Sequence, residues 1–362
     1  MQKAIPFMQF RGGSSKGLFF LAKDLPSNAE ALHKTVLLAM EGTETGDPRQ
    51  IDGLGGAQPL TSKAAVVGPS EDPAADVDYF FLQVVVGKGR VSTGQTCGNI
   101  LAAVAPFAIE AGLVSALDPI TTVRIKMLNT GGICEVLVQT PSGNVNYAGN
   151  ASIDGVPGTA APIICNYLDV AGSTCGALLP TGNAIDQIDG FALTCIDNGM
   201  PVVLLRAADF GLQGTESVAE LAGNYELKKQ IEQIRLQIGP KMNLGDVSTQ
   251  TVPKMCLIAP PQQGGLINTR MFIPHEVHDA IGVLAAVSVA TAALMQGSIA
   301  AGIAHLPQSD HGLYSIEHPS GECSVTLDFE VVEGKIEVKK AGVLRTARLL
   351  SRGEVYVKKE QD

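Results

Sequence analysis

Runs of apolar residues rich in Val, Ile and Leu recur along the chain and are bounded by Gly, Pro or Asp. This pattern is typical of β-strands that bury at least one face. The runs predict strands at Lys16–Leu21, Lys63–Val67, Val77–Val86, Val123–Met127, Glu135–Gln139, Pro201–Leu205, Lys254–Ala259, Cys323–Val332 and Gly353–Val357. The hydrophobic pattern therefore favours a protein dominated by sheet.

Helix signals are fewer and fall into four segments. Glu30–Met40 is amphipathic, and Ile100–Leu113 is predicted as a mostly apolar helix. Leu227–Gly239 is predicted as an exposed helix, because charged side chains recur there at i,i+3 spacing. The fourth helix covers about residues 277–296 and lies within a long uncharged stretch.

The uncharged stretch from Ala280 to Ala304 is long enough to cross a bilayer. It is rich in Ala, Gly and Ser, contains Gln296, and stands alone in the chain. A helix that is apolar on all sides can also form the buried centre of a large domain. We expect this second arrangement.

The two halves of the chain follow one plan. In the first half, a strand that begins at Lys63 is followed by a hairpin and then by Cys97 before an apolar helix. In the second half, a strand that begins at Lys254 is followed by another strand-like segment and then by His275 before an apolar helix. The order of elements predicts two similar α+β domains, each a sheet around one apolar helix.

The sequence is acidic, with a net charge of −10 from 26 Lys and Arg against 36 Asp and Glu. An acidic surface repels nucleic-acid phosphates and anionic lipid headgroups, so neither nucleic acid nor a membrane is expected as a partner. Seven cysteines without a C-x-x-C pair argue against disulfides or a zinc site and favour a reducing compartment. Because Met1–Phe10 lacks a signal-peptide pattern, we expect a cytoplasmic protein.

Two residues have settings that suit acid–base chemistry. Cys97 precedes the first apolar helix, whose dipole would stabilise a thiolate, and Gly98 lets a substrate approach the backbone. Lys63 leads directly into an apolar strand, where partial burial favours the neutral amine that acts as a base. The alternatives are a small core cysteine and a lysine whose amine reaches solvent at a strand end.

Several polar clusters are candidates for binding an anion. Arg11–Gly17 is a Gly-rich turn dense in donors, and it lacks the spacing of a P-loop. His275 and His278 could bind a metal, but no third ligand is evident nearby, so carboxylate contact or capping is favoured. Arg270 and His318 belong to similar polar loops, for which ordinary loop polarity is the alternative.

Eight blocks spread over the whole chain resemble the PrpF family. They are Arg11–Gly17, Asp52–Lys63, Cys97–Ile109, Ile153–Ala161, Leu179–Asn183, Cys195–Val202, Asn268–His275 and Glu317–Gly321. The resemblance implies an α+β, diaminopimelate-epimerase-like fold, with two pseudo-symmetric domains that each wrap a mostly antiparallel sheet round a central apolar helix. The expected domains are residues 1–183, completed by 345–362, and residues 184–344.

The resemblance also implies a reaction. Members of the family move a proton between allylic carbons of a small unsaturated polycarboxylic acid, without a cofactor or a metal. The motifs are most similar to those of the branch that acts on 4-oxalomesaconate in the breakdown of gallate and lignin-derived aromatics; other branches act on methylaconitate and methylitaconate. The family's catalytic base, the lysine of T-S-K, falls on Lys63, and its partner, the cysteine of C-G-N, falls on Cys97.

The matching motifs imply substrate contacts as well. The residues expected to hold carboxylates are Arg11, Ser14, Ser15 and Lys16 on one side and Arg270 and Ser320 on the other. Further contacts are expected at Gly13, Ser62, Thr96, Gly98, Asn99, Asn183, Met200, His275 and His318. Ser14 and Thr96 stand where the family pattern has Thr and Asn. The second helix is headed by His275 rather than a second cysteine, which favours double-bond migration over epimerisation.

Two non-enzymatic interpretations remain open. The protein could be an accessory to an aconitase-like iron–sulfur enzyme, or a tricarboxylate-binding protein with an inert cleft. Lys63 and Cys97 argue for an enzyme only through the resemblance. The expected partner is a small-molecule polycarboxylate, and a homodimer is an open alternative to a monomer.

Overall fold

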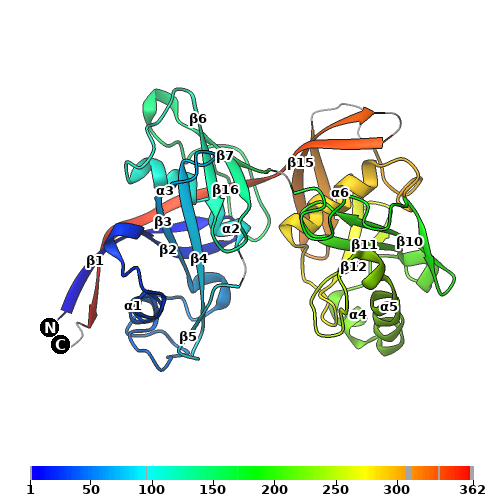
Figure 1. Ribbon diagram of the computed structural model, residues 1–362, viewed down its shortest axis with the longest axis horizontal. Helices are drawn as coiled ribbons and strands as arrows, with labels where there is room; N and C mark the ends of the chain where they lie inside the picture. The colour runs from blue at the N-terminus through cyan, green and yellow to red at the C-terminus, as the bar shows by residue number, and fades with distance from the viewer. Residues whose placement is uncertain (1, 95, 169, 307–311, 333–334, 359–362) are drawn as a thin grey trace. The chain divides into compact units, whose positions relative to one another are not determined.

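The computed structural model describes residues 2–94, 96–168, 170–306, 312–332 and 335–358, whose elements are labelled in Figure 1. The chain forms two compact units, residues 1–165 with 344–362 and residues 166–343. Segment 166–183 therefore belongs to the second unit, whereas the sequence placed it in the first. Its backbone explains the difference, because Gly172 N donates to Asp197 O and Ala171 forms a β-bridge with Asn198. The return of the chain to the first unit at Leu344 lies next to the predicted position 345.

The first unit alternates antiparallel and parallel strand pairs. Its strands are β1 (Gln2–Gly12), β2 (Ser15–Leu21), β3 (Lys63–Pro69), β4 (Val77–Val85), β5 (Arg90–Ser92), β6 (Ile120–Met127), β7 (Ile133–Gln139) and most of β8 (Pro162–Tyr167), whose last two residues belong to the second unit. Pairs β1–β2, β3–β4 and β6–β7 are antiparallel, and pairs β2–β3 and β4–β6 are parallel. The α-helices are α1 (Ala29–Glu41), α2 (Gly98–Leu101) and α3 (Val104–Glu110), with 3-10 turns at Ala22–Asp24, Pro59–Thr61 and Pro141–Gly143.

The second unit uses the same order of pairings. Its strands are β9 (Asp186–Ile188), β10 (Phe191–Asp197), β11 (Pro201–Arg206), β12 (Lys254–Ala259), β13 (Ile267–Phe272), β14 (Leu313–His318) and β15 (Gly321–Val332). Pairs β10–β11, β12–β13 and β14–β15 are antiparallel, and pairs β11–β12 and β13–β14 are parallel. The helices are α4 (Val218–Gly223), α5 (Tyr225–Ile238) and α6 (Val283–Leu294), with 3-10 turns at Ala207–Phe210 and Pro240–Met242.

The internal repeat predicted from the sequence is present in this topology. Helix α1 joins β2 to β3 as α4 and α5 join β11 to β12, and α2 with α3 joins β4 to β6 as α6 joins β13 to β14. The last strand, β16 (Lys335–Lys358), pairs with β15 through its first part and with β1 through its last part. The red β16 and the blue β1 run side by side in Figure 1. The α+β fold of two pseudo-symmetric, mostly antiparallel halves is confirmed.

The sheet of the first unit has an outer face, covered by α1, and an inner face, covered by α2 and α3. On the outer face Leu18 and Phe20 pack into one cluster with residues of α1. On the inner face Phe10 and Phe19 contact Phe107 of α3, with ring centroids 6.3 and 5.6 Å away. Because successive side chains of a strand point to opposite faces, each residue of β1 to β4 can be assigned to one face.

The central helix of the first unit differs from its prediction. The sequence favoured one helix over Ile100–Leu113, whereas the structure has α2 and α3 separated at Ala102 and Ala103. Pro106 explains the break, because it has no N–H to donate to the carbonyl of Ala102 and its ring crowds that carbonyl. The helix begins again at Val104, where Pro106 lies in the first turn and its missing donor costs nothing.

The central helix of the second unit is shorter than predicted. Helix α6 begins at Val283 after Gly282, so His275 lies in the preceding loop and does not head the helix. That loop folds back on β13, because His278 N donates to Met271 O. Residues 285–293 of α6 are all buried, so the uncharged stretch is the buried centre of a domain, as expected. No helix in the described ranges is both long and apolar enough for a membrane span.

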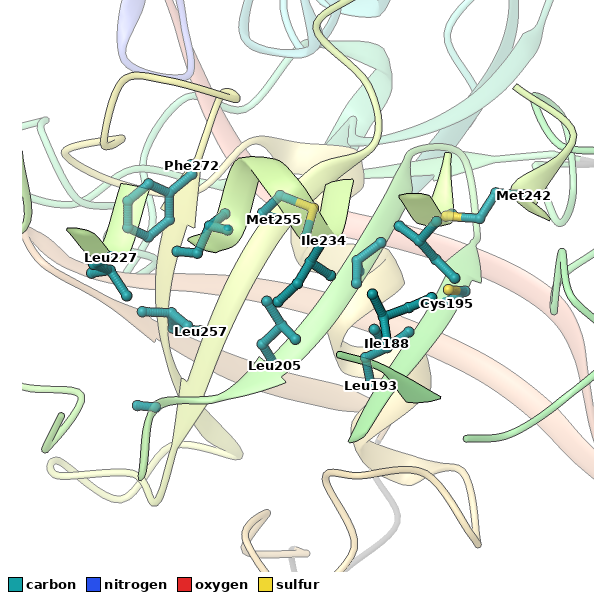
Figure 2. Close-up of a cluster of buried hydrophobic side chains, with 14 of the residues drawn as sticks. Ile188, Leu193, Cys195, Leu205, Leu227, Ile234, Met242, Met255, Leu257 and Phe272 are labelled. Carbon is teal, nitrogen blue, oxygen red and sulfur yellow. The ribbon is translucent and has the colours of Figure 1, made fainter. Parts of the chain in front are cut away.

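Helix α5 was predicted as exposed, and this prediction is wrong. Leu227, Ile231, Ile234 and Ile238 recur at helical spacing and pack into the core with β11 and β12 (Figure 2). The expected pair with Glu232 does form, but Arg235 is fully buried. A charged residue is tolerated there because its guanidinium bonds the Glu232 carboxylate and the carbonyl oxygens of Gln250 and Val252.

Replacing Ile234 by Ala should lower the free energy of unfolding by about 2–5 kcal/mol, because the cavity forms in a packed core. Urea unfolding of the whole chain measures the loss. Leu236→Ala on the same helix is the control, since Leu236 is 41% exposed and its truncation should cost less than about 0.5 kcal/mol. Equal losses in the two variants would contradict this packing.

Candidate active site

A two-residue turn, Gly13–Ser14, joins β1 to β2 and rests on the start of α2. Gly13 has φ of +51°, and a Cβ there would lie 2.1 Å from Asn99 Oδ1. Asn99 Nδ2 donates to Ser14 Oγ at 3.2 Å. A Cβ on Gly12 would lie 2.4 Å from Asn99 O, so only a glycine at this position lets the inner face of the sheet approach the helix this closely. The structure thus brings together three predicted substrate contacts, Gly13, Ser14 and Asn99.

Lys63 begins β3 on the inner face of the sheet. Its side chain is 7% exposed, and Nζ donates to Gln83 Oε1 at 2.5 Å and lies 5.3 Å from the centroid of the Phe81 ring. Gln83 Nε2 donates to the carbonyl oxygens of Pro59, Ser62 and Val84, which turns its own oxygen towards the lysine. An amide oxygen accepts from an amine or an ammonium alike, so Gln83 fixes the position of Nζ without fixing its charge.

Cys97 lies immediately before α2 and is partly exposed. Its carbonyl oxygen accepts from Leu101 N at 2.9 Å and from Tyr79 Oη at 3.4 Å. Tyr79 faces the same side of the sheet as Lys63, because it stands opposite Val67, four residues along β3. Lys63 and Cys97 therefore both belong to the inner face, while Gln95 of the cysteine motif lies outside the described residues.

Two hydroxyl groups at the candidate site are buried without a hydrogen-bond partner among the described residues. They are Ser15 Oγ and Thr96 Oγ1. Ser15 stands opposite Gly12 and therefore lies on the inner face, 2% exposed. A buried hydroxyl without a partner costs about 1–3 kcal/mol, so both groups suit contact with a polar ligand. Ser62 differs, because its Oγ donates to Gln50 Oε1 at 2.8 Å and holds the preceding Gly-rich loop.

Arg11 and Lys16 leave the sheet on the outer face. They stand opposite each other in β1–β2, one residue from Gly12 and Gly17, which face α2. Arg11 Nη1 donates to Gly13 O at 2.9 Å and to Thr346 O and Oγ1 at 3.0 Å. Burial, followed by the charge of Arg348, lowers the pKa of Arg11. Arg11 thus ties the turn to β16, and the structure does not bring Arg11 or Lys16 to the side of Lys63.

Arg270 has a structural setting in the second unit. It lies on β13 opposite Leu257, whose side chain packs in the core with α5. Its Nε donates to Glu216 O at 2.7 Å, and its Nη1 donates to Asn268 Oδ1 and Thr269 O at 2.9 and 2.8 Å. Burial lowers its pKa, with Glu216 opposing the shift. These bonds hold the segment before α4, on the face away from α6.

The other predicted contacts of the second unit lie in four separate segments of the chain. Asn183 is exposed and donates to Asp186 Oδ1 at 2.9 Å, and Met200 O accepts from Ser288 Oγ at 2.7 Å. His318 ends β14, with its Nδ1 3.3 Å from Ser320 Oγ in the following turn. His275 is exposed, with Nδ1 3.9 Å from Glu232 Oε2. In the described part of the chain, no three His, Cys, Asp or Glu side chains gather as a metal site would require.

Sequence reasoning missed Gln83 and Glu317. Gln83 was visible as a polar residue within the apolar run of β4, but its contact with Lys63 depends on the register of the β3–β4 hairpin. The Glu317 carboxylate accepts from the backbone N–H groups of Gln262, Gln263 and Gly265 at 2.6, 2.7 and 2.9 Å. It fixes a loop more than 50 residues earlier in the chain, and no local sequence pattern predicts such a contact.

Replacing Gly13 by Ala should lower the free energy of unfolding by more than about 1–3 kcal/mol, because strain at positive φ adds to a clash with Asn99. Gly143→Ala is the matched control, since Gly143 has φ of +75° and open space around its Cβ. Denaturant unfolding of both variants separates the clash from the backbone strain. If the two variants lost the same stability, the turn would not depend on its contact with α2.

Curated relatives match nearly the whole chain. The chain is 55% identical over 352 residues to the (4E)-oxalomesaconate Delta-isomerase of Novosphingobium sp. (strain KA1), covering 97% of each protein. It is 54% identical over 356 residues to the 4-oxalomesaconate tautomerase of Pseudomonas putida (strain KT2440), covering 98% of this chain and 97% of the relative.

Solved structures agree with these relatives. A methylitaconate-delta-isomerase superposes with a TM-score of 0.89 at 33% identity, covering 98% of this chain and 96% of that one. A hydroxyproline epimerase from Agrobacterium vitis superposes with a TM-score of 0.52 at 12% identity, covering 98% of this chain and 94% of that one, and shares the fold alone. The chain is therefore an isomerase with the diaminopimelate-epimerase-like fold. The model of the PrpF protein family matches residues 2–358, and the chain belongs to that family.

Proposed function

We propose that the chain catalyses a 1,3-allylic proton shift on an unsaturated tricarboxylate, 4-oxalomesaconate, without a cofactor. The observation that carries the proposal is the buried amine of Lys63, held by a neutral amide on the inner face beside α2. The substrate is supported by two relatives, 54–55% identical over nearly their whole length, that are named for it. We place the reaction in the breakdown of gallate and lignin-derived aromatics, as the resemblance of the motifs implies.

The proposed mechanism begins with neutral Lys63. Its Nζ takes a proton from a carbon next to the double bond, so that a C–H bond breaks and an N–H bond forms. The electron pair left behind spreads over the conjugated system as a dienolate. Donors placed where charge develops stabilise this intermediate, and the unpartnered hydroxyls of Ser15 and Thr96 have the chemistry to do so.

The second half of the reaction returns the proton two carbons away. A new C–H bond forms at the far allylic carbon, the double bond moves, and the amine is neutral again. The proton comes from Lys63 itself, or from the thiol of Cys97, in which case the thiolate left behind takes up the proton of the Lys63 ammonium. No electrons leave the substrate, so the step needs neither an oxidant nor a reductant.

A second candidate is an isomerase for methylitaconate-type acids. The structure that superposes with a TM-score of 0.89 has that activity in its name. The family pattern has Asn before the cysteine, and this chain has Thr96 there. A change at this position of the cysteine motif would alter which substrate the chain prefers. Supplying both acids to one preparation separates the two candidates.

The test is proton NMR of the purified protein with the keto tautomer of 4-oxalomesaconate in deuterated buffer. Deuterium entering an allylic carbon, together with migration of the double bond, is the expected result. The same spectrum with methylitaconate reports the second candidate. Exchange with neither acid would overturn the proposed reaction.

Lys63→Met should lower kcat by about 100-fold or more, because the variant lacks the general base. Substrate binding should stay measurable by calorimetry, since the side chain keeps a similar volume. Lys88→Met, at an exposed position of the same unit, is the control and should retain the wild-type rate. A Lys63→Met variant with more than a tenth of the wild-type rate would remove the lysine from the mechanism.

Gln83→Glu should lower the rate at pH 7 by about 10-fold, because a carboxylate beside Nζ holds the amine as ammonium. The rise of the rate with pH should be displaced to higher pH in the variant, because the added carboxylate opposes loss of a proton from the ammonium. Rate–pH profiles of the variant and the wild type make the comparison, with Gln187→Glu as an exposed control. A profile unchanged in shape would show that Gln83 does not touch the working base.

A further inference from the structure

The Gly-rich loop between α1 and β3 closes around one buried side chain, the amide of Gln50. Gln50 is 2% exposed although it lies in a loop, and its φ of +51° is a conformation that residues with a side chain rarely adopt. A Cβ on Gly55 would overlap Gln50 Oε1, so the loop needs glycine there to admit the amide. Backbone strain of this kind costs about 1–3 kcal/mol and persists only where the surrounding contacts hold it.

Both ends of the Gln50 amide are engaged. Its Oε1 accepts from Ala57 N at 2.7 Å and from Ser62 Oγ at 2.8 Å. Its Nε2 donates to Glu41 Oε1 at 3.3 Å. Because a backbone N–H can only donate, the end of the amide that meets Ala57 is the oxygen. Gln50 thus joins the end of α1 to the residue that precedes Lys63.

Glu41, the last residue of α1, anchors Gln50. Its side chain is fully buried, and its Oε1 also accepts from Gly87 N at 2.8 Å, in the turn between β4 and β5. Its Oε2 has no hydrogen-bond partner in the ranges that the structure describes. A buried oxygen without a partner costs about 1–3 kcal/mol. The loop therefore carries two unfavourable features, and features of this kind cluster at functional sites.

Ser62 connects this loop to the amine of Lys63. Ser62 is fully buried, and while its hydroxyl donates to Gln50, its carbonyl oxygen accepts from Gln83 Nε2 at 3.1 Å. Gln83 Oε1 in turn accepts from Lys63 Nζ. A continuous path of hydrogen bonds therefore runs from Glu41 to Nζ of Lys63, and every link in it is at least partly buried. Burial strengthens such links, because water competes less for their donors and acceptors.

We propose that Gln50 is a positioning residue for the base. It holds Ser62 in place, and Ser62 with Gln83 sets the direction of the Lys63 amine. The inference rests on the proposed function, since that function makes Lys63 the base. It also assigns a role to the Gly-rich loop, in which Gly55 leaves room for the amide.

The first test is the kinetics of Gln50→Ala, which keeps the backbone conformation and removes the amide. A loosened base slows proton transfer more than it weakens binding, so kcat should fall about 10-fold and KM should stay within about threefold. Ile51→Ala, at the next residue, is the control, because Ile51 is 75% exposed and its truncation should leave kcat unchanged. A kcat of Gln50→Ala within about twofold of the wild type would overturn the proposal.

A double-mutant cycle with Gln83→Ala separates positioning from a general loss of structure. If Gln50 acts through Gln83, the double variant should be at most about threefold slower than Gln83→Ala alone, because the second change breaks a path already broken. Effects that multiply would show that Gln50 acts elsewhere and would overturn the proposal. Ser62→Ala removes only the hydroxyl that links Gln50 to β3, and its kcat should fall by a similar factor. It replaces Gln50→Ala if that variant does not fold, and an unchanged kcat in Ser62→Ala would also contradict the path.

A readout without turnover distinguishes failure of this inference from failure of the proposed function. In protein labelled with carbon-13 lysine, the Cε resonance of Lys63 is identified by its absence in Lys63→Met. Gln50→Ala and Gln83→Ala should move this resonance in the same direction, and Ile51→Ala should leave it in place. An unmoved resonance in Gln50→Ala would remove the positioning role. A moved resonance, with no turnover in the wild type, would defeat the proposed reaction alone.

Discussion

The candidate site depends on how closely the first sheet approaches its central helix. A Cβ on Gly12 would lie 2.4 Å from Asn99 O of α2, and a Cβ on Gly17 would lie 2.7 Å from Lys63 O of the neighbouring strand and 3.2 Å from Ile100 Cδ1 of α2. A side chain at Gly12 would push α2 away from the sheet, and one at Gly17 would crowd both β3 and α2. The absence of two methyl groups therefore lets one face of the sheet present Lys63, Ser15 and the segment around Cys97 to the same helix. Every chemical role assigned to the first unit follows from that contact.

Much of this arrangement could be predicted from the sequence, and the failures have physical causes. Strands β3, β4, β11 and β12 were found because they are rich in apolar residues, whereas β1 and β10 carry mixed residues and form strands through their pairing with neighbours. The break before α3 was readable from Pro106 alone. The face of the sheet on which Arg11 lies could not be predicted. The strand period of two says that Arg11 and Gly12 point to opposite faces, but it does not say which of the two faces the helix. The burial of Arg235 depends on carbonyl groups 15 and 17 residues away.

The repeat places equivalent lysines in different chemical settings. Lys63 has the fixed direction that the proposed base requires, through an amide that is itself held by three carbonyl groups. Lys254 makes no hydrogen bond of this kind in the described part of the chain, and burial with the charge of Arg235 lowers its pKa to about 8. The two copies of one supersecondary plan thus differ at the lysine, because Gln83 lies directly opposite Lys63 and presents its amide oxygen as a hydrogen-bond acceptor there. The repeated fold fixes the position of each lysine within its unit, and the neighbouring side chains determine its chemical setting.

Strand β16 has a consequence for how the chain is made. Arg11 of β1 pairs with Arg348 of β16, 337 positions later in the sequence. During translation β1 can pair with β2 at once, but its other edge has no partner until β16 leaves the ribosome. At cellular rates of synthesis that interval is on the order of tens of seconds. Through that time the nascent first unit exposes an open strand edge, the kind of surface that molecular chaperones shield.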